Sequence, residues 1–376
     1  MKALKVAIVH DWLVGGGAER VVYELHQIFP EAPIYTSYCN DEWRAKMDGK
    51  VITGFLQNWP FSKLRKLLPP LRIWWITRLN LTGYELIISS SGAEAKGIKN
   101  RKWQKADGKW VQPVHINYCH APTHYYWSRY EEYLANPGWG VFNSLGRFGL
   151  RLLVGPLRKW DYKAAQRPDH IIANSTHTQT AVKTYYGRDS VVIHPPVDTL
   201  RFQLTTHDSQ LTTRTGFVIA GRQTPYKRVD LAVAACTLLG VPLTVIGNGP
   251  DHQNLKSMAG PTITFVTNAT DVQVAQYFAQ ALGFIFPGID DFGITPVEAM
   301  AAGTPVIAYK AGGALDYITP KTGLFFEHQT TDSLQNALKR FNSSSYNTDD
   351  LQAAAKKFSN DVFRKNIRQE IGRIIQ

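Results

Sequence analysis

Short apolar runs alternate with longer amphipathic stretches through the first half of the chain. The runs Lys5–Asp11, Tyr84–Ser90, His115–Cys119 and His170–Ala173 have the length and composition of buried parallel strands. After a loop that ends in three glycines, apolar residues spaced three and four apart predict a helix that starts near Ala18. Strands that alternate with helices in this way indicate an α/β fold built on a parallel sheet.

The same pattern starts again in the second half. Strands are expected at Gly216–Ala220, Leu243–Ile246, Thr262–Val266, Leu282–Phe286 and Pro305–Tyr309, with helices at Val229–Leu239, near Asp271–Ala279 and at Pro296–Ala302. The segment His194–Thr215, two prolines followed by polar residues, is the expected linker, and an amphipathic final helix is expected at Asp350–Ile375. Because 376 residues suit two domains, the predicted fold class is α/β with two doubly wound, Rossmann-like domains.

Composition and charge narrow the class of protein. A hydrophobic fraction of 44% excludes a disordered chain, and three cysteines exclude a disulfide scaffold and a four-cysteine zinc site. No apolar run is long enough to span a membrane, and the apolar start of the chain is broken at His10 and Asp11, unlike a signal peptide, so a cytoplasmic protein is expected. The net charge of +12 lies almost wholly in residues 1–200, which predicts an anionic partner for that half: phosphate, membrane or nucleic acid.

Two loops of the second half follow predicted strands and carry charged residues. In Gly221–Arg228, Arg222 and Lys227 flank a turn that Pro225 stiffens just before a helix. Two fixed cations beside helix N–H groups suit a diphosphate, although a solvated basic turn is the alternative. The next strand ends in Gly247–Pro250, which is typical of a tight turn.

The stretch Asp290–Pro305 is the most informative in the sequence. Asp290 and Asp291 lie in a loop, Pro296 is suited to the first turn of a helix, and Glu298 is expected in that turn. Glu298 can stabilise the helix start or accept hydrogen bonds from ribose hydroxyls. The two aspartates could suggest a metal pair, but no other acid or histidine lies near them in sequence, so we expect no metal.

Two features of the first half also follow predicted strands. Gly15–Gly17 allows the backbone to approach an anion at a helix N-terminus, although a flexible turn is the alternative. The sequence there matches neither the Gly-x-Gly-x-x-Gly fingerprint nor the P-loop, which argues against NAD or ATP chemistry. His120 lies at the end of a strand, where it is either a ligand-facing or a structural residue, and Cys119 is expected to be buried.

Together these residues resemble the retaining glycosyltransferases of family 4, which have the two-domain GT-B fold. The resemblance is carried, in the family's order, by Gly16–Glu19, Cys119–Pro122, Gly221–Arg222 with Lys227, Gly247–Pro250 and Asp290–Pro305. The run from Tyr118 to Trp127 looks most like mannosyltransferases of bacterial surface-polysaccharide assembly. The resemblance implies a first domain at 1–198, a donor domain at 199–357, a central cleft between them, and a last helix, about 358–376, that crosses back to the first domain.

The resemblance also implies roles for single residues. Arg222 and Lys227 would neutralise the diphosphate of a nucleotide-sugar donor, and Glu298 would bind its ribose. Asp290 stands where the family has a glutamate that touches the donor sugar, and it is one methylene shorter. The remaining donor contacts would come largely from backbone groups, those of Gly16, Gly17, Phe292, Gly293, Ile294 and Thr295. His120 would contact the transferred sugar near the reacting carbon, so the expected catalytic residues are His120, Asp290, Arg222 and Lys227.

The implied reaction transfers a hexose with retention of configuration and without a metal or other cofactor. GDP-mannose is the favoured donor, and the acceptor would be lipid-linked or a growing glycan. A nucleotide-sugar epimerase of the same fold, which needs no acceptor, is an alternative. A non-catalytic basic protein that binds membrane or nucleic acid is another.

Two basic segments of the first half bear on the partner. Asn58–Leu81 and Gly138–Trp160 mix arginines and lysines with aromatic and aliphatic residues and contain no acid. Such segments can lie on an anionic bilayer, pack on the core with solvated cations, or bind nucleic acid. We favour membrane contact, which predicts a peripheral protein at the inner face of the cell membrane. Pro69 and Pro70 predict that the first segment is not one long helix.

Overall fold

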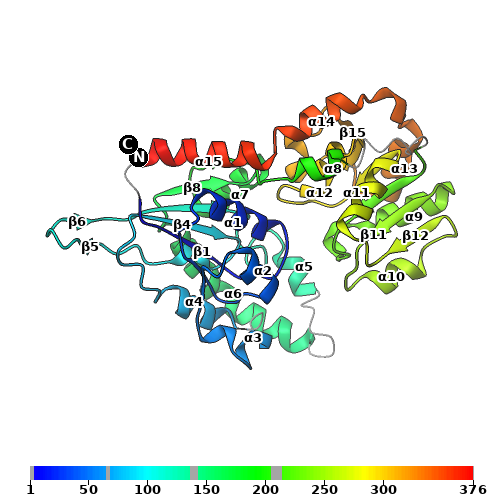
Figure 1. Ribbon diagram of the computed structural model, residues 1–376. Coiled ribbons are helices and arrows are strands. Elements are labelled where there is room, and N and C mark those ends of the chain that lie inside the picture. Colours follow the sequence, from blue (N-terminus) through cyan, green and yellow to red (C-terminus); the bar gives the residue numbers. More distant parts are fainter. Residues whose placement is uncertain (1–3, 65–67, 136–142, 205–213, 376) are drawn as a thin grey trace. The chain divides into compact units, whose positions relative to one another are not determined.

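The computed structural model describes residues 4–64, 68–135, 143–204 and 214–375 (Figure 1). The chain forms two compact units. Unit 1 comprises Met1–His194 with Arg364–Gln376, and unit 2 comprises Pro195–Phe363. The division after His194 lies four residues before the expected boundary at 198, and the end of the chain is assigned to unit 1.

Unit 1 contains a seven-stranded parallel sheet in the order β3-β2-β1-β4-β7-β8-β9. Its strands are β1 Val6–His10, β2 Ile34–Thr36, β3 Val51–Thr53, β4 Leu86–Ser91, β7 Val114–Cys119, β8 His170–Ala173 and β9 Val191–Val192. The four strands predicted from apolar runs are confirmed. The three that the sequence did not indicate have only two or three residues each, too few for a periodic pattern.

Helices and a small hairpin surround this sheet. They are α1 Gly17–Ile28, α2 Asp41–Lys46, α3 Phe61–Leu64, α4 Pro69–Ile76, α5 Tyr130–Ala135, α6 Asn143–Ala165 and α7 Thr176–Tyr186, with the hairpin strands β5 Trp103–Gln104 and β6 Trp110–Val111. Pro69 and Pro70 occupy the first two positions of α4, where a proline needs no N–H partner. The predicted break in the first basic segment is therefore confirmed.

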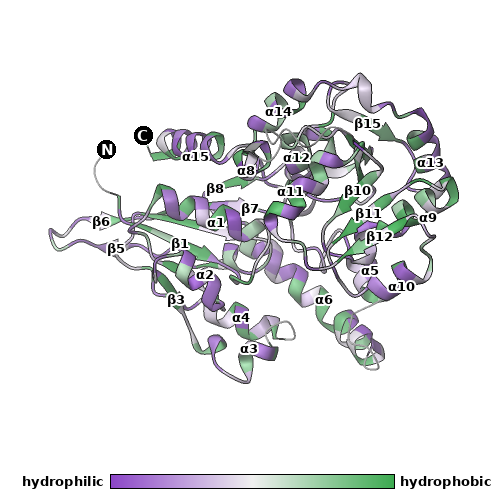
Figure 2. Cartoon of the chain, turned by 45° about the vertical axis from the view of Figure 1, so that its right-hand side comes forward, coloured by the Kyte–Doolittle hydropathy of each residue, from purple (hydrophilic) through white to green (hydrophobic). Residues whose placement is uncertain are grey.

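Unit 2 contains a six-stranded parallel sheet in the order β12-β11-β10-β13-β14-β15. Its strands are β10 Phe217–Ala220, β11 Leu243–Ile246, β12 Ile263–Val266, β13 Gly283–Phe286, β14 Val306–Tyr309 and β15 Gly323–Phe326. Its helices are α8 Thr199–Leu204, α9 Val229–Leu239, α10 His252–Ser257, α11 Asp271–Gln280, α12 Ile294–Ala301, α13 Thr331–Arg340 and α14 Thr348–Lys356. Two Rossmann-like domains are thus confirmed, and in Figure 2 the strands of both sheets are among the most hydrophobic parts of the chain.

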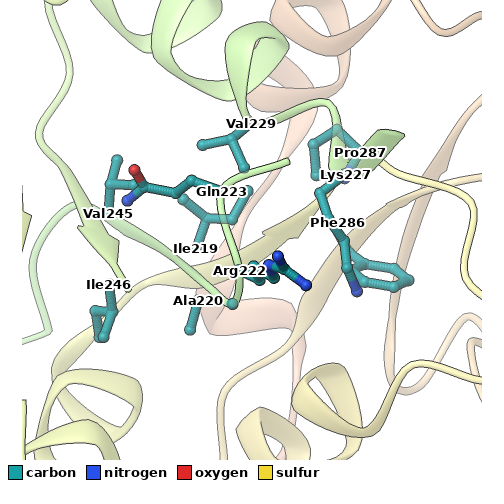
Figure 3. Close-up of a pocket in the computed structure, with 11 residues that line it drawn as sticks. Ile219, Ala220, Arg222, Gln223, Lys227, Val229, Val245, Ile246, Phe286 and Pro287 are labelled. Atoms are coloured by element: carbon teal, nitrogen blue, oxygen red, sulfur yellow. The ribbon is translucent and has the colours of Figure 1, made fainter. Parts of the chain in front are cut away.

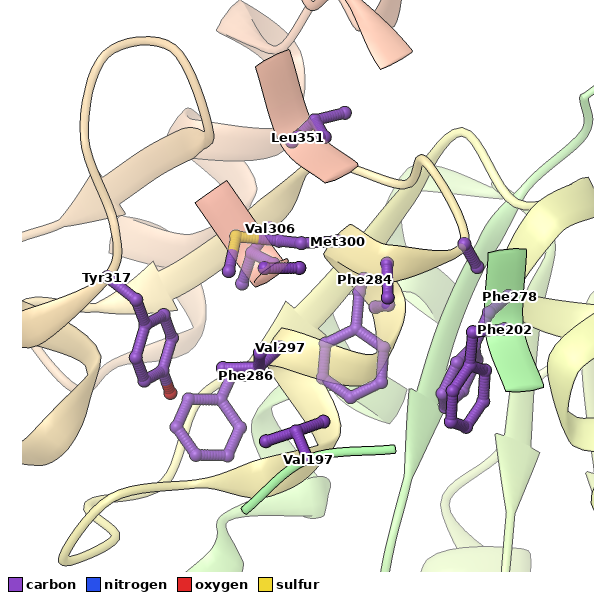
Figure 4. Close-up of a cluster of buried hydrophobic side chains, with 14 of the residues drawn as sticks. Val197, Phe202, Phe278, Phe284, Phe286, Val297, Met300, Val306, Tyr317 and Leu351 are labelled. Carbon is purple, nitrogen blue, oxygen red and sulfur yellow. The ribbon is translucent and has the colours of Figure 1, made fainter. Parts of the chain in front are cut away.

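The core of unit 2 fixes α12 against its sheet (Figure 4). Val297 and Met300 of α12 belong to the same buried cluster as Phe284 of β13. Phe202 of α8 stacks on Phe278 of α11 with 5.7 Å between the ring centroids. Because these side chains are fully buried, the start of α12 is held on a rigid scaffold.

The end of the chain departs from the prediction of one helix from Asp350 to Ile375. It forms two helices, α14 and α15 (Asn360–Ile375), with a break at 357–359. At the break Phe358 enters the core of unit 2, and its carbonyl accepts a hydrogen bond of 2.9 Å from the Val197 N–H. Because the spacing of apolar residues continues across the break, the break is not visible in the sequence. Beyond it, the Arg364 guanidinium pairs with Glu24 of α1 at 2.8 Å.

Candidate functional site

The middle of the sheet in unit 2 is the point where its strand order reverses. β10 and β13 lie side by side there, although three helices and two strands separate them in sequence. Loops that follow adjacent parallel strands at such a point form the usual ligand crevice of this type of sheet. The loop after β10 carries Arg222 and Lys227, and the loop after β13 carries Asp290.

The loop after β10 lines a pocket within unit 2 (Figure 3). The wall of the pocket is formed by Arg222, Gln223 and Lys227, together with the end of β11, the end of β13 and Pro287 after it. The Arg222 side chain is exposed and forms no hydrogen bond or ion pair with any part of the chain that the structure describes. Its guanidinium is therefore available to an anionic ligand.

Lys227 and Asp290 connect the two loops. The Lys227 ammonium forms an ion pair with Asp290 Oδ2, and both side chains are largely buried, 23% and 12% exposed. Asp290 Oδ1 is buried and accepts no hydrogen bond from any described residue. The carboxylate thus keeps an unused acceptor beside a cation. Burial, with Asp290 nearby, raises the pKa of Tyr317 well above its usual value, so that phenol stays neutral.

Two glycines let neighbouring segments press against these loops. A Cβ on Gly249 would lie 2.2 Å from the Gln223 carbonyl oxygen, and one on Gly313 would lie 2.3 Å from the Cα of Phe292. Neither position can hold a side chain unless the backbone moves. The Gly247–Pro250 turn is therefore more than a reversal of the chain, because it supports the Arg222 loop.

The N-terminus of α12 follows Asp290 and Asp291 in the same loop, with Phe292 and Gly293 between them. Gly293 precedes the helix with φ of 85°, and among the residues that the structure describes no side chain caps the first turn. The N–H groups that begin at Ile294 and Thr295 therefore form an anion-binding end of the helix. The Phe292 side chain is buried in the core and its carbonyl accepts a 3.0 Å hydrogen bond from Tyr317, so any ligand contact of Phe292 falls to its backbone N–H.

The helix starts two residues earlier than predicted, and this corrects two positions. Pro296 is the third residue of α12 rather than the first, where its missing N–H is still harmless. Glu298 is the fifth residue and lies beyond the first turn. Its side chain is buried, with Oε1 3.6 Å from the Arg201 guanidinium, and Arg201 also bonds Asp271 at 2.7 Å. The sequence did not indicate that a cation accompanies Glu298.

In unit 1 the strand order reverses between β1 and β4, and Asp11 organises the loops there. Its carboxylate accepts the backbone N–H groups of Gly92 and Ala93 at 3.0 Å and of Ala95 at 2.7 Å. From the sequence, Asp11 was expected only to end a strand. A carboxylate directly after a buried strand was the signal available for this role.

The glycine loop after β1 leads into α1. Gly16 is the residue before the helix and Gly17 is its first residue, at the end predicted to approach an anion. The Glu19 carboxylate folds back and accepts the N–H groups of Val14, at 3.3 Å, and Gly15, at 3.1 Å. Part of this loop is thus already bound to an internal anion, which leaves the backbone of Gly16 and Gly17 as the part open to a ligand.

His120 follows β7 at the carboxyl edge of the sheet. A 2.8 Å hydrogen bond joins its Nε2 to the Ser90 hydroxyl, and the Ser90 carbonyl oxygen lies 2.7 Å from Nδ1 of His10. The rings of His10 and His120 meet edge to face with centroids 6.2 Å apart. Ser90 and His10 are candidate site residues that were not predicted from the sequence, because they become neighbours of His120 only through strand pairing.

Buried polar pairs fix the segment that carries His120. Lys96 lies 2.7 Å from Asp161, and burial disfavours its charge, but that carboxylate outweighs the effect and raises the pKa of Lys96. Asp161 also accepts hydrogen bonds from Thr123 at 2.9 Å and from Trp127 at 2.7 Å. Cys119 is buried, as predicted.

The structure thus brings the predicted residues together in two groups. In unit 2 the two loops of the switch point hold Arg222, Lys227 and Asp290 beside the start of α12, with Glu298 one turn further along that helix. In unit 1 the corresponding loops hold Gly16, Gly17 and His120. Within the described ranges, no three His, Cys, Asp or Glu side chains are grouped as a metal site. No helix in the described part of the chain has the length and apolar character to cross a membrane.

Comparison with known proteins gives two family matches, one for each half. Residues 15–201 match the model described as Glycosyltransferase Family 4, and residues 207–358 match Glycosyl transferases group 1. A GDP-mannose-dependent alpha-mannosyltransferase of Mycobacterium tuberculosis is 37% identical over 126 residues, which is 32% of each chain. A GDP-mannose-dependent monoacylated alpha-(1-6)-phosphatidylinositol monomannoside mannosyltransferase of Corynebacterium glutamicum is 29% identical over 191 residues, 44% of this chain and 50% of the other. This chain therefore aligns with only a third to a half of these relatives' length.

Solved structures are similar over nearly the full chain. Anabaena HepE in complex with UDP superposes with a TM-score of 0.67 at 16% identity, covering 98% of this chain and 100% of that one. The sucrose-phosphate synthase of Thermosynechococcus elongatus superposes with a TM-score of 0.69 at 16% identity, covering 99% of both chains. At these identities the likeness shows the fold, which is the GT-B fold.

Proposed function

Since the chain belongs to glycosyltransferase family 4, we propose that it transfers a hexose from a nucleoside-diphosphate sugar to a lipid-linked or growing glycan. The observation that carries this proposal is the group formed by Arg222, Lys227 and Asp290 beside the uncapped N-terminus of α12. It combines two cations, helix N–H groups and an acceptor with an unused oxygen, which suits a diphosphate joined to a sugar.

In the proposed donor complex the diphosphate binds Arg222, Lys227 and the first N–H groups of α12. Lys227 then exchanges Asp290 for a phosphate oxygen, and the Asp290 carboxylate accepts hydrogen bonds from the sugar hydroxyls. The backbone of Phe292, Gly293 and Thr295 completes the contact, and Glu298 binds the ribose.

The same cations favour the reaction itself. As the anomeric C–O bond breaks, negative charge grows on the leaving diphosphate, and preorganised donors stabilise it. The acceptor hydroxyl forms the new C–O bond from the same face, which retains configuration, and its proton passes to the departing phosphate oxygen. His120 contacts the sugar near that carbon, and Gly16 and Gly17 approach the phosphate. We propose that no metal takes part, because cations and helix N–H groups already supply the charge stabilisation.

The donor and the place of action are finer parts of the proposal. GDP-mannose is favoured by the resemblance of the Tyr118–Trp127 run and by the names of the mannosyltransferases that the chain partly matches. The basic first half supports peripheral contact with the inner face of the cell membrane, where lipid-linked acceptors for surface polysaccharides are found.

Thermal unfolding with GDP, UDP and ADP, each with and without EDTA, tests the donor site. A nucleotide at 100 times its dissociation constant adds about 2.7 kcal/mol to the free energy of unfolding. We expect GDP to raise the melting temperature and EDTA to leave that rise unchanged. A rise that disappears with EDTA would contradict the metal-free site, and no rise with any nucleotide would contradict a donor site.

Transfer is then measured with radiolabelled GDP-mannose and a membrane extract. We expect label to enter a lipid-soluble product only when the extract is present. Conversion of the sugar without any acceptor would instead indicate the epimerase.

A further inference from the structure

One helix of unit 1 is apolar on two opposite sides. Along α6, the buried side faces the sheet through Val154, Ala164 and Ala165. The other side presents Leu145, Phe148 and Leu152, which are 61%, 66% and 65% exposed. These three residues are spaced by three and four positions, so they form one stripe along the helix. Such a stripe of large apolar side chains facing water is unusual on a soluble helix.

The stripe lies on the part of α6 that extends past the sheet. Asp161 anchors the second half of the helix to Thr123, four residues beyond the end of β7. Because the chain enters α6 from the carboxyl edge of the sheet and returns toward β8, the residues before this anchor extend away from that edge. The segment 143–155 is about 18 Å long at 1.5 Å per residue. It projects from the same edge at which His120 lies.

Cations accompany the stripe. Between positions 143 and 160 the chain has four basic residues and no acid. The Arg158 side chain packs on other residues of unit 1, because its Cζ lies 5.5 Å from the ring centroid of Trp127 and 4.8 Å from that of Tyr130. Arg147, Arg151 and Lys159 remain on the outer part of the helix, and Arg151 and Lys159 are exposed.

The first basic segment differs in that two of its arginines are held by other groups of unit 1, while its exposed apolar side chains Trp59, Leu64 and Trp74 do not share one helix. Arg72 is buried and paired with Glu94 at 2.6 Å, and Arg78 lies over the ring of Trp74 at 4.5 Å. Arg65, Lys66 and Leu67 lie outside the described residues, as do Trp139 and Phe142 of the second segment. Within the described residues, α6 is the helix on which three large exposed apolar side chains follow a helical spacing beside arginines that form no ion pair. Arg147 donates a 3.3 Å hydrogen bond to the Ser144 hydroxyl on the same helix.

We infer that the stripe Leu145–Phe148–Leu152 of α6 inserts into the surface of an anionic lipid bilayer, with Arg147 and Arg151 at the headgroups. This inference rests on the proposed function, in that it places a lipid-linked acceptor next to the edge that carries His120. A cationic helix with an apolar outer face is the form that binds an anionic membrane interface. The stripe is aliphatic apart from one phenyl ring, so it offers no hydrogen-bond donors to read nucleic acid bases. A second copy packed on the same stripe would bring the cations of the two helices against each other.

A fluorophore at position 148 tests the contact directly. Because Cys39, Cys119 and Cys236 are buried, Phe148→Cys supplies the accessible thiol for an NBD label on the full chain. The vesicles are phosphatidylcholine alone or mixed equally with phosphatidylglycerol. We expect NBD emission to rise and shift to the blue with the mixed vesicles only. The matched control is Leu238→Cys on α9, a leucine that is 69% exposed in unit 2, and its emission should not change.

Unlabelled variants measure the strength of binding by sedimentation with the same vesicles. Phe148→Ser with Leu152→Ser should weaken binding at least tenfold, because both large side chains lose their apolar burial. Arg147→Gln with Arg151→Gln should abolish the preference for phosphatidylglycerol. Binding of the serine variant equal to that of the original chain, or no binding of the original chain at all, would overturn the inference. An NBD signal that rises with protein concentration without vesicles would also overturn it, in favour of a second copy.

Measuring nucleotide binding in the same variants distinguishes a failure of the membrane inference from a failure of the proposed function. The melting-temperature rise with GDP reports unit 2 and should be the same in all these variants, which also shows that they are folded. A chain that binds GDP but no vesicles refutes only the membrane face. A chain that binds vesicles but no nucleotide refutes only the donor site.

Discussion

Replacing Arg222 and Lys227 one at a time separates ligand binding from folding in unit 2. Both residues are proposed to bind the donor diphosphate, but their surroundings differ. Arg222 is exposed and forms no ion pair within the described residues, whereas Lys227 is the cationic partner of a largely buried carboxylate. The two alanine variants should therefore weaken nucleotide binding alike and differ in stability.

The expected magnitudes follow from these environments. A charge-assisted hydrogen bond contributes about 1.5–3 kcal/mol, so Arg222→Ala should lower GDP affinity roughly 10- to 100-fold. Its free energy of unfolding should stay within about 0.5 kcal/mol, as for other exposed substitutions. Lys227→Ala leaves Asp290, 12% exposed, without its cation. A fully buried unpaired charge costs about 3–5 kcal/mol, and with this partial exposure we expect roughly 1–3 kcal/mol.

Calorimetric GDP titration and urea unfolding measure the two quantities. The control is Lys339→Ala on the exposed end of α13, which removes a positive charge far from the site. It measures how much the net charge of the chain alone affects GDP binding. Asp290→Asn combined with Lys227→Ala should recover most of the lost stability, because the uncompensated charge is gone. GDP affinity unchanged by Arg222→Ala would refute the diphosphate site, and unchanged stability in Lys227→Ala would refute the ion pair as a link between the loops.

Three further predictions concern other parts of the chain. Burial, with two nearby arginines, lowers the pKa of His115 to about 3, whereas in the unfolded chain this histidine takes up a proton near pH 6.5. The unfolded state therefore binds a proton first as the pH is lowered, and the free energy of unfolding decreases. Lowering the pH from 7.5 to 5 should reduce the free energy of unfolding by about 2 kcal/mol because of this residue. Urea unfolding should not show this reduction in His115→Asn. Plots of the free energy of unfolding against pH that run parallel in the two proteins would contradict the prediction. Gly249→Ala should lower GDP affinity, because the new Cβ displaces the Gln223 backbone. The control is Gly372→Ala on α15, where a Cβ meets open space, and its affinity should not change. Equal affinities in the two variants would contradict the close approach. Asp290→Glu should change the transfer rate if the carboxylate touches the sugar, and an unchanged rate and donor KM would show that the shorter acid has no effect.

The sequence alone was sufficient for the order of the larger elements and for the loops that carry the candidate site. Apolar runs such as His170–Ala173 and Leu243–Ile246 match the observed strands residue for residue, because burial on both faces of a parallel sheet leaves an uninterrupted apolar signal. Arg222, Lys227 and Asp290 were found because each follows such a strand, and parallel strands bring their carboxyl ends to one edge.

The tertiary structure decided which charges are paired and which side chains are buried. Arg72 and Arg222 look alike in sequence, yet one is buried against Glu94 and the other is exposed at the switch point. Local periodicity is set by neighbours a few residues away, whereas an ion pair such as Lys227–Asp290 joins residues 63 positions apart. At the break between α14 and α15, Phe358 lies in the core and accepts a hydrogen bond from Val197, which is far away in the chain. Contacts of that range depend on which strands lie side by side, and only the folded chain determines that order.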